Sequence, residues 1–470
     1  MKQSRFGISG ALSLLGLLGL LVGCGRASLP APALPLVATP PEPFREIRPE
    51  VPPLPPLTPP VVETTELDTG LTVMVSPRPS EVATVCYGNR DAGKDTMPER
   101  WHHLSMAVKL AVKGTALEAL EVDVDHDASS TRLCVSVMPG DVGVALDALA
   151  EVLPRRTFPP ASIDRVKNRA LATRNRKPNA GAYAAEWLLG LRFFAVQGWR
   201  VGEALRLFDA ASAADELARS FHPKKSVIAV AGPLEPQPVR ELVERHLGHW
   251  VMADEPAPPP RHDPPLPPPS PWVIHAHVSP LTQAQLAMAL SAPARDSPDR
   301  AAFDIASRIV GGLYTSRLNL RMRTDEGHTY GAHAAYAARS ADGHLLLMSA
   351  VAPQRVLEAV DAMLDEVASI QTEMPTQLEV RQGRETARER LRVQLDTTSS
   401  LAKMMCVLFR DRATPDSWVA HDQALADVTP ERVQAVVRRY FSKRSPLVVV
   451  GPGLAVDRLR QARQDVTIDP

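Results

Sequence analysis

The chain repeats itself, and this internal repeat restricts its possible folds more than any other feature of the sequence. Two segments share a pattern of an apolar run that ends on a Gly-Pro turn: Phe221–Leu234 and Phe441–Leu454. A second matching pair, Ala145–Val152 and Ala359–Val367, precedes them in the same order and at nearly the same spacing. Two ordered matches favour duplication over chance similarity, so we expect two structurally similar domains.

Each half mixes strand-like and helix-like segments. Residues 132–138 alternate apolar and polar side chains as a half-buried strand does, whereas residues 144–153 and 162–172 have helical spacing. This mixture predicts an α+β fold, in which helices cover one face of an antiparallel-rich sheet. A Pro-rich stretch, residues 253–271, separates the halves and is expected to be a linker, because Pro disrupts both helices and sheets.

The N-terminus has the features of an exported, lipid-anchored protein. A basic start precedes the apolar run Ile8–Val22, which is short for a membrane span and typical of a signal peptide. The Leu-Val-Gly-Cys that follows resembles a bacterial lipobox, which implies a lipid on Cys24; an ordinary signal peptide is the alternative. The expected location is the bacterial envelope, by default the outer membrane facing the periplasm, with the inner membrane as the alternative. Residues 24–61 are dense in Pro and are expected to form an extended tether.

Composition and missing motifs argue against several function classes. The 53 basic residues balance the 53 acidic ones, and no basic or aromatic stripe suggests a nucleic-acid partner. The motifs of serine hydrolases, P-loop proteins and dinucleotide-binding proteins are absent.

Cys86 and Cys134 occupy strand-like segments, and Cys406 a helical one. An oxidising periplasm permits a Cys86–Cys134 disulfide, and two buried thiols are an equal alternative.

Three segments carry a family resemblance. Residues 102–115 read His-His-Leu-Ser-Met-Ala-Val-Lys-Leu-Ala-Val-Lys-Gly-Thr and end on a turn. Residues 311–331 contain Gly-Gly-Leu-Tyr-Thr-Ser-Arg-Leu and then Arg-Met-Arg-Thr-Asp-Glu-Gly-His-Thr-Tyr-Gly. Together with Thr-Gly-Leu at residues 69–71, they resemble the M16 (pitrilysin- and insulinase-like) metallopeptidases over residues 62–455. The resemblance implies two tandem M16-type domains that form a clamshell.

The first domain departs from the family at the zinc site. Members of the family hold zinc with His-x-x-Glu-His on a helix that precedes a Lys-Gly-Thr-like turn. Aligned on that turn, the ligand positions here hold Ser105, Val108 and Lys109. Zinc peptidases of this kind need two His one helical turn apart and a carboxylate, and no His-x-x-x-His occurs in this region. The third ligand in the family is a Glu on a later helix, and simple spacing points to Glu186 for that position. One carboxylate without two His does not hold zinc, so we expect this chain to bind no zinc.

In the second domain the resemblance implies a substrate-binding pair. Arg323 and Tyr330 fall on the Arg and Tyr that, in the family, lie across the internal chamber from the zinc and hold the peptide near the scissile bond. Thr324 replaces the usual Glu. Arg offers a fork of donors to a peptide carbonyl, and a Tyr hydroxyl can donate to the same group. The alternative is that Arg323 is a surface helix residue and Tyr330 a strand core residue.

Two other patterns could carry chemistry but are expected to be structural. Residues 123–127, Asp-Val-Asp-His-Asp, could bind a divalent ion weakly, although a polar turn before the next strand is the simpler interpretation. Ser105 and Lys109 are four residues apart on a predicted helix, as in a Ser/Lys dyad, but a helix offers no strained elbow for the Ser. The adjacent His102 and His103 are expected to be partly exposed near the start of that helix.

The sequence therefore predicts a non-catalytic M16-type lipoprotein. It would be the peptide-binding subunit of a zinc metalloprotease heterodimer, hold no cofactor itself, and depend on a partner that carries His-x-x-Glu-His and the zinc. The alternatives are a peptide-binding or scaffold lipoprotein with no protease role, and an active metalloendopeptidase with a divergent metal site.

The predicted boundaries are 1–23 for the signal peptide, 24–61 for the lipidated Cys and tether, 62–252 for the N-terminal domain, 253–271 for the linker, 272–455 for the C-terminal domain and 456–470 for a tail.

Overall fold

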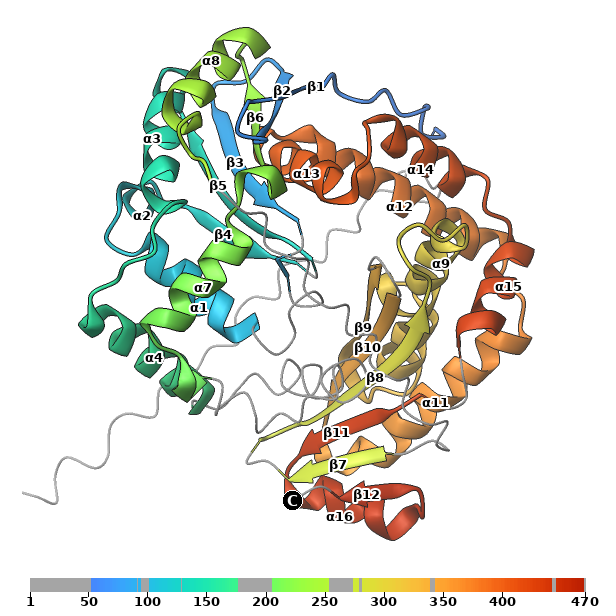
Figure 1. Cartoon of the computed structure of the whole chain (residues 1–470). Coiled ribbons are helices and arrows are strands. Elements are labelled where there is room, and N and C mark those ends of the chain that lie inside the picture. Colours follow the sequence, from blue (N-terminus) through green and yellow to red (C-terminus); the bar gives the residue numbers. More distant parts are fainter. Residues whose placement is uncertain are drawn as a thin grey trace, which may run out of the picture. The chain divides into compact units, whose positions relative to one another are not determined.

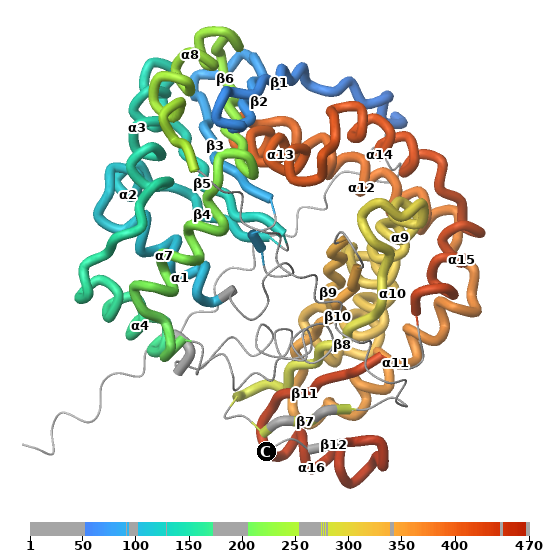
Figure 2. The backbone as a smooth tube through the Cα atoms, in the orientation of Figure 1, coloured from blue at the N-terminus to red at the C-terminus, as the bar shows by residue number. Residues whose placement is uncertain are grey.

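A computed structural model shows the fold of most of the chain beyond residue 51. It describes residues 52–90, 92–93, 101–127, 129–175, 205–252, 274–278, 281–338, 343–441 and 445–468. The predicted signal peptide, Cys24, most of the tether, Glu186 and the linker at 253–271 lie outside these residues. None of the helices in the described part is long and apolar enough to span a membrane. Figures 1 and 2 show the two sheets and the helices around them.

The first sheet has six strands in the spatial order β1-β2-β6-β3-β5-β4. β2 and β6 are parallel, and the other neighbours are antiparallel. The strands are β1 Glu63–Glu66, β2 Thr72–Pro77, β3 Ala83–Asn89, β4 Asp123–His126, β5 Thr131–Val137 and β6 Ser226–Gly232. The helices of this half are α1 Trp101–Val112, α2 Ala116–Ala119, η2 Pro139–Asp141, α3 Val142–Val152, α4 Pro160–Asn175, α7 Ala210–Ser220, η3 Pro223–Lys225 and α8 Pro236–Leu247.

The second sheet has six strands in the order β12-β7-β11-β8-β10-β9. Its strands are β7 Ile274–Val278, β8 Ala284–Ala292, β9 Thr329–Ala338, β10 Gly343–Val351, β11 Leu447–Gly451 and β12 Val466–Ile468. Its helices are α9 Arg300–Ser307, η4 Arg308–Gly312, α10 Arg317–Asn319, η5 Leu320–Asp325, η6 Pro353–Arg355, α11 Val356–Thr372, α12 Gln377–Asp396, α13 Thr398–Asp411, α14 Asp416–Ala426, α15 Pro430–Tyr440 and α16 Gly453–Ala462. η4 and η5 are wide, π-helical turns.

The two sheets repeat one topology, which confirms the predicted duplicated α+β fold. The order β2-β6-β3-β5-β4 corresponds strand by strand to β7-β11-β8-β10-β9, and both β2–β6 and β7–β11 are parallel pairs. The matching sequence segments take matching places. Phe221 ends α7 before β6, and Phe441 ends α15 before β11. The repeat in sequence is therefore a repeat of helix, turn and central strand.

The first sheet is covered by helices on both faces, although the sequence predicted cover on one. Side chains alternate across a strand, so each face of β6 can be followed separately. Ile228 and Val230 belong to the core that contains α1, α3, α7 and α8. Val227, Ala229 and Ala231 point the other way, into a second apolar cluster with α12 and α13. The unbroken apolar run of β6 is typical of a strand buried on both faces and was the available signal.

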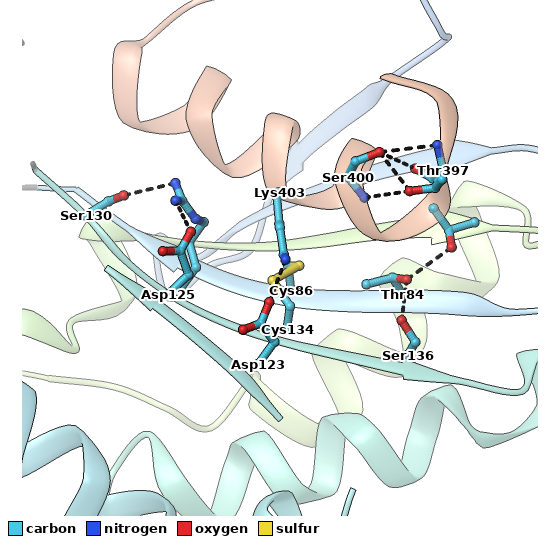
Figure 3. The surroundings of a disulfide bond; sticks show 12 residues. Thr84, Cys86, Asp123, Asp125, Ser130, Cys134, Ser136, Thr397, Ser400 and Lys403 are labelled. Atoms are coloured by element: carbon cyan, nitrogen blue, oxygen red, sulfur yellow. Dashed lines mark hydrogen bonds and ion pairs between the residues drawn. A yellow bond between two sulfur atoms is a disulfide. The ribbon is translucent and has the colours of Figure 1, made fainter. Parts of the chain in front are cut away.

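α13 belongs to the second half of the chain and packs on the first sheet. Leu401 and Met405 are fully buried in the shared cluster. A capping box on Thr397 begins the helix. The Lys403 ammonium lies 2.5 Å from a carboxylate oxygen of Asp123, on the face of the sheet that α13 covers (Figure 3). The Thr398 hydroxyl adds a buried 3.2 Å hydrogen bond from β3.

A disulfide joins Cys86 of β3 to Cys134 of β5 beneath α13 (Figure 3). The two residues are direct cross-strand partners. The sequence left a disulfide and free thiols as equal alternatives, and the strand register decides between them because it brings the two sulfurs together. Cys406 of α13 is a buried free thiol in the same apolar cluster.

Both ends of the described chain are more structured than the sequence predicted. The last residues of the predicted tether pack on the second half: Arg388 donates to the Leu54 and Pro55 carbonyls at 3.4 and 3.1 Å, and Leu57 packs against the cluster under α13. The predicted tail contains most of α16 and the strand β12, which pairs with β7. Pro-rich composition and chain position alone did not show these contacts, because both depend on distant partners.

Candidate functional site

The ligand positions of the first domain lie on α1, and their side chains do not fit zinc. Ser105 is half-buried, Val108 is fully buried in the core, and Lys109 is exposed. Val108 has no donor atom and Lys109 carries a positive charge, so neither replaces an imidazole. Gly114 takes a positive φ of 75° after the helix, which explains the Lys-Gly-Thr turn. The structure contains the helix that the family alignment predicted, α1, but its side chains at the three ligand positions do not supply the imidazole and carboxylate atoms that bind zinc.

Other possible metal ligands do not gather elsewhere in the described ranges. No group of three His, Cys, Asp or Glu side chains there could hold a metal ion. The His103 ring packs edge-on against Phe208, with centroids 5.5 Å apart. Glu186 lies in the range that the structure does not describe. Within the described ranges, the residues present do not form a zinc site.

Most of the acidic cluster at 123–127 lies in the edge strand β4. The sequence had favoured a polar turn at these residues. β4 covers Asp123–His126, and its carboxylates are engaged by cations. Arg132 pairs with both Asp125 and Asp127, and Arg410 of α13 also pairs with Asp127. Burial would raise the pKa of Asp127, but Arg410 and Arg132 outweigh burial and hold the pKa below its usual value. These carboxylates therefore join β4 to α13 instead of offering oxygens to a metal ion.

Arg323 and Tyr330 lie on either side of a tight turn in the second half. Arg323 is on η5, and its guanidinium carbon lies 4.5 Å from the centre of the Tyr314 ring. Gly327 provides the turn with a φ of 64°. Tyr330 is near the start of β9 and is 91% exposed, so it is not the core residue of the alternative interpretation. Its hydroxyl is accessible to a ligand.

Sequence reasoning missed two residues that organise this surface. Tyr314 is 68% exposed and supports Arg323 by a cation–π contact. The buried Asn319 donates to the Tyr314 carbonyl at 2.7 Å and accepts from the Ala332 amide of β9 at 3.2 Å. Asn319 therefore fixes the Tyr314 turn to the strand that carries Tyr330. The only signal in the sequence was their position within the family-like segment.

The remaining conspicuous residues of that segment have structural roles. Arg317 forms a bidentate pair with Glu379 at 2.6 and 3.0 Å, which ties α10 to the start of α12. Gly311 passes so close to β9 that a Cβ there would lie 2.9 Å from the Ala334 Cβ. The Gly-rich turn is thus required by its close packing against β9. We call Tyr314, Arg323 and Tyr330 the Arg–Tyr surface.

The fold is that of the M16 peptidases. A protease from Helicobacter pylori matches with a TM-score of 0.74 and 15% identity, over 84% of this chain and 100% of that chain. The peptidase M16 inactive domain from Pseudomonas fluorescens matches with a TM-score of 0.69 and 18% identity, over 83% and 98%. At these identities the likeness shows the fold alone.

Sequence comparison points to the same family for part of the chain. The profile of the peptidase M16 inactive domain matches residues 214–386. An uncharacterized zinc protease of Mycobacterium leprae is 24% identical over 237 residues, which are 50% of this chain and 52% of that protein. The chain therefore spans about half the length of the curated relatives that it matches. Residues 214–386 therefore match the M16 inactive-domain family, and the predicted resemblance to M16 proteins is confirmed.

Proposed function

We propose that this chain is a non-catalytic, peptide-binding M16-type subunit that works with a zinc-carrying M16 partner. The observation that carries the proposal is the contrast between its two halves. α1 presents Ser105, Val108 and Lys109 where zinc ligands would be required, whereas the Arg–Tyr surface presents an oriented cation and an exposed phenol. A chain with this contrast can hold a peptide, and its described residues include no metal site that could activate water.

The chemistry of the Arg–Tyr surface suits a peptide backbone. Arg323 offers several N–H donors in one plane, and Tyr314 supports one face of that plane. The Tyr330 hydroxyl can donate to a peptide carbonyl or to the oxyanion that forms on it during hydrolysis by a partner. A zinc ion, held by His-x-x-Glu-His of the partner, would supply the activated water. We also propose that the chain acts in the bacterial envelope, anchored through lipid on Cys24.

The proposal is tested by peptide hydrolysis with a reconstituted pair. The chain would be mixed with an M16 protein that carries His-x-x-Glu-His from the same genome, and cleavage of fluorescein-labelled casein would be followed. We expect no cleavage by this chain alone and cleavage by the pair. In the pair, Arg323→Ala should lower kcat/KM by about 10²-fold, the range seen when a transition-state donor is removed.

A matched control separates this role from general damage. Arg321 lies on the same turn, but it pairs with Glu326 and Asp365 instead of stacking on Tyr314. Arg321→Ala should leave kcat/KM within about two-fold. Equal effects of the two variants would assign Arg323 to structure, and metal-dependent cleavage by the purified chain alone would refute the non-catalytic role.

The alternative, a peptide-binding or scaffold lipoprotein without a protease role, predicts a different result. Labelled casein peptides would then bind this chain with a dependence on Arg323, while no M16 partner would produce cleavage.

A further inference from the structure

A small polar cavity of about 360 Å³ lies beside the turn between β1 and β2. None of its lining residues belongs to the Arg–Tyr surface. Four come from the β1–β2 hairpin, one follows β3, one is in η3 and one is on α13: Glu66, Asp68, Gly70, Thr72, Arg90, Lys224 and Phe409. The cavity therefore lies where the first sheet meets the helix from the second half.

The Arg90 guanidinium is held in place by its surroundings, and the stem of the exposed Lys224 runs close to the backbone of the hairpin. The Arg90 guanidinium carbon lies 5.1 Å from the centre of the Phe409 ring, and one of its nitrogens donates to the Lys224 carbonyl at 3.1 Å. The Lys224 stem crosses directly over Gly70, where a Cβ would lie 2.6 Å from the Lys224 Cγ. Gly70 also has a φ of 81°. Both the positive φ and the lack of space for a Cβ therefore favour Gly at this position.

Two carboxylates complete the lining without neutralising these cations. Glu66 ends β1 and Asp68 lies in the following turn, and both are exposed. Across the described ranges, no ion pair within 4 Å joins either carboxylate to Arg90 or Lys224. The cavity thus presents two positive and two negative groups that do not satisfy one another.

We propose that this cavity binds a small zwitterion, namely a free amino acid or a short peptide with both ends free. Its carboxylate would lie on Arg90 and Lys224, because a guanidinium fork matches a carboxylate. Its ammonium group would lie on Glu66 and Asp68. A lining with two charges of each sign disfavours a simple anion or cation and suits a ligand that carries both. The volume is at the lower end of the range for ligand cavities, which fits a ligand of this size.

A ligand in the cavity would also affect the packing of α13, from the second half of the chain, on the first sheet. Phe409 is on α13, whereas the charged groups belong to the first half. A bound zwitterion would stabilise Arg90 against Phe409 and so favour the packed position of α13. By linkage, ligand at about ten times its Kd should raise the thermal midpoint, since binding to the folded state stabilises that state.

The test uses the full-length protein and L-alanyl-L-alanine as the probe, with binding measured by titration calorimetry. The charged lining and small size favour weak binding, with a Kd of about 1 mM. Two blocked probes, N-acetyl-alanyl-alanine and alanyl-alanine amide, should each bind at least about ten-fold more weakly. Arg90→Gln and Asp68→Asn should each cause a similar loss. Asp68 is exposed in a turn, so its variant tests the site without endangering the fold.

The outcomes separate this site from the proposed function. Arg323→Ala should leave L-alanyl-L-alanine binding unchanged, because Arg323 does not line the cavity. Saturable binding that needs both free ends and Asp68 supports the site, whether or not the chain takes part in proteolysis. No saturation below about 20 mM, or equal binding of the blocked probes, would overturn it.

Discussion

The sulfur of Cys406, on α13, occupies the space directly above Gly88 of β3. A Cβ built on Gly88 would lie 2.7 Å from both the Cβ and the sulfur of Cys406, which is closer than packed atoms approach. Burial raises the pKa of the Cys406 thiol to about 12, so it remains a neutral, unreactive packing group at neutral pH. The absence of a side chain at Gly88 therefore allows a helix from one half of the chain to lie against the sheet of the other.

Gly88→Ala should destabilise the protein because it forces α13 away from the sheet. We expect a loss of about 1–3 kcal/mol in the free energy of unfolding, measured by urea denaturation. Gly140→Ala is the matched control, since a Cβ at Gly140 meets nothing within 4 Å, and it should change stability by less than about 0.5 kcal/mol. Equal effects of the two substitutions would contradict the close packing inferred for Gly88.

Loosening α13 should expose the sulfur on it, Cys406, and the two sulfurs beneath it, Cys86 and Cys134. Cys86, Cys134 and Cys406 are all buried, so native protein should react slowly with iodoacetamide and with dithiothreitol. Leu401→Ala removes a fully buried side chain between α13 and the sheet and should cost about 2–5 kcal/mol. Mass spectrometry should then show faster labelling of Cys406 and faster disulfide reduction, with both rates rising together.

The control for this experiment is Val360→Ala. Val360 is fully buried in α11, in the core of the second sheet. A similar loss of stability there should accelerate labelling of Cys406 much less, if α13 leaves the sheet by local opening. Equal acceleration by both variants would mean that the sulfurs are reached only by global unfolding.

Asp422 should make stability depend on pH in the acid range. It is buried on α14 between Arg388 and Arg392, at 2.9 and 2.6 Å. Burial would raise its pKa, but hydrogen bonds from the two arginines lower it to about 2. Because the folded pKa lies below the unfolded one, the carboxylate stabilises the fold above about pH 4, and this contribution disappears between about pH 4 and pH 2.

Asp422→Asn tests that assignment. Removing the charge leaves two partly buried arginines without their partner, so we expect a loss of about 3 kcal/mol at pH 7. The variant should also show a shallower fall in unfolding free energy from pH 4 to pH 3 than the wild type, in urea titrations at each pH. Parallel pH profiles would show that Asp422 does not titrate as inferred.

The end of the Pro-rich segment should contribute to stability. A chain that begins at Pro52 retains the contacts of Leu54 and Pro55 with Arg388 and the packing of Leu57, whereas a chain that begins at Glu63 lacks them. Both begin after Cys24, the proposed lipid site, so the comparison isolates the contacts of residues 52–62. We expect the shorter chain to be less stable by about 1–3 kcal/mol in urea, since it loses apolar burial and four hydrogen bonds to the carbonyls of Leu54, Pro55 and Val61. Equal stability would show that these contacts contribute nothing.

Tyr314→Leu should weaken peptide binding if the Arg–Tyr surface acts as proposed. The substitution keeps an apolar side chain but removes the ring under Arg323, a contact worth about 0.5–1 kcal/mol at an exposed position. Binding of labelled casein peptides should weaken by about two- to five-fold in fluorescence anisotropy, less than for Arg323→Ala. Tyr440→Leu would not serve as a control for the loss of a Tyr ring elsewhere, because the Tyr440 hydroxyl donates to the buried Asp299 and its loss would affect the fold. An unchanged affinity would exclude Tyr314 from the site.

The sequence by itself determined the features that depend on neighbours along the chain. The repeated segments around Phe221 and Phe441 predicted two matching units, and local periodicity predicted their strands and helices. The motif from Gly311 to Gly331 predicted the family, and it led to Arg323 and Tyr330 as candidate residues. Residue types at the ligand positions on α1 led to the prediction that this helix holds no zinc.

Only the tertiary structure decided which distant segments meet. The contacts between α13 and the first sheet join residues about 300 positions apart, such as Thr84 and Thr398, and no local pattern specifies such a pair. The same holds for the register that joins Cys86 to Cys134, the docking of Leu54 on Arg388, and the placing of Tyr314 under Arg323. Periodicity records which face of an element is buried, but the partner of that face is set by the packing of the whole chain.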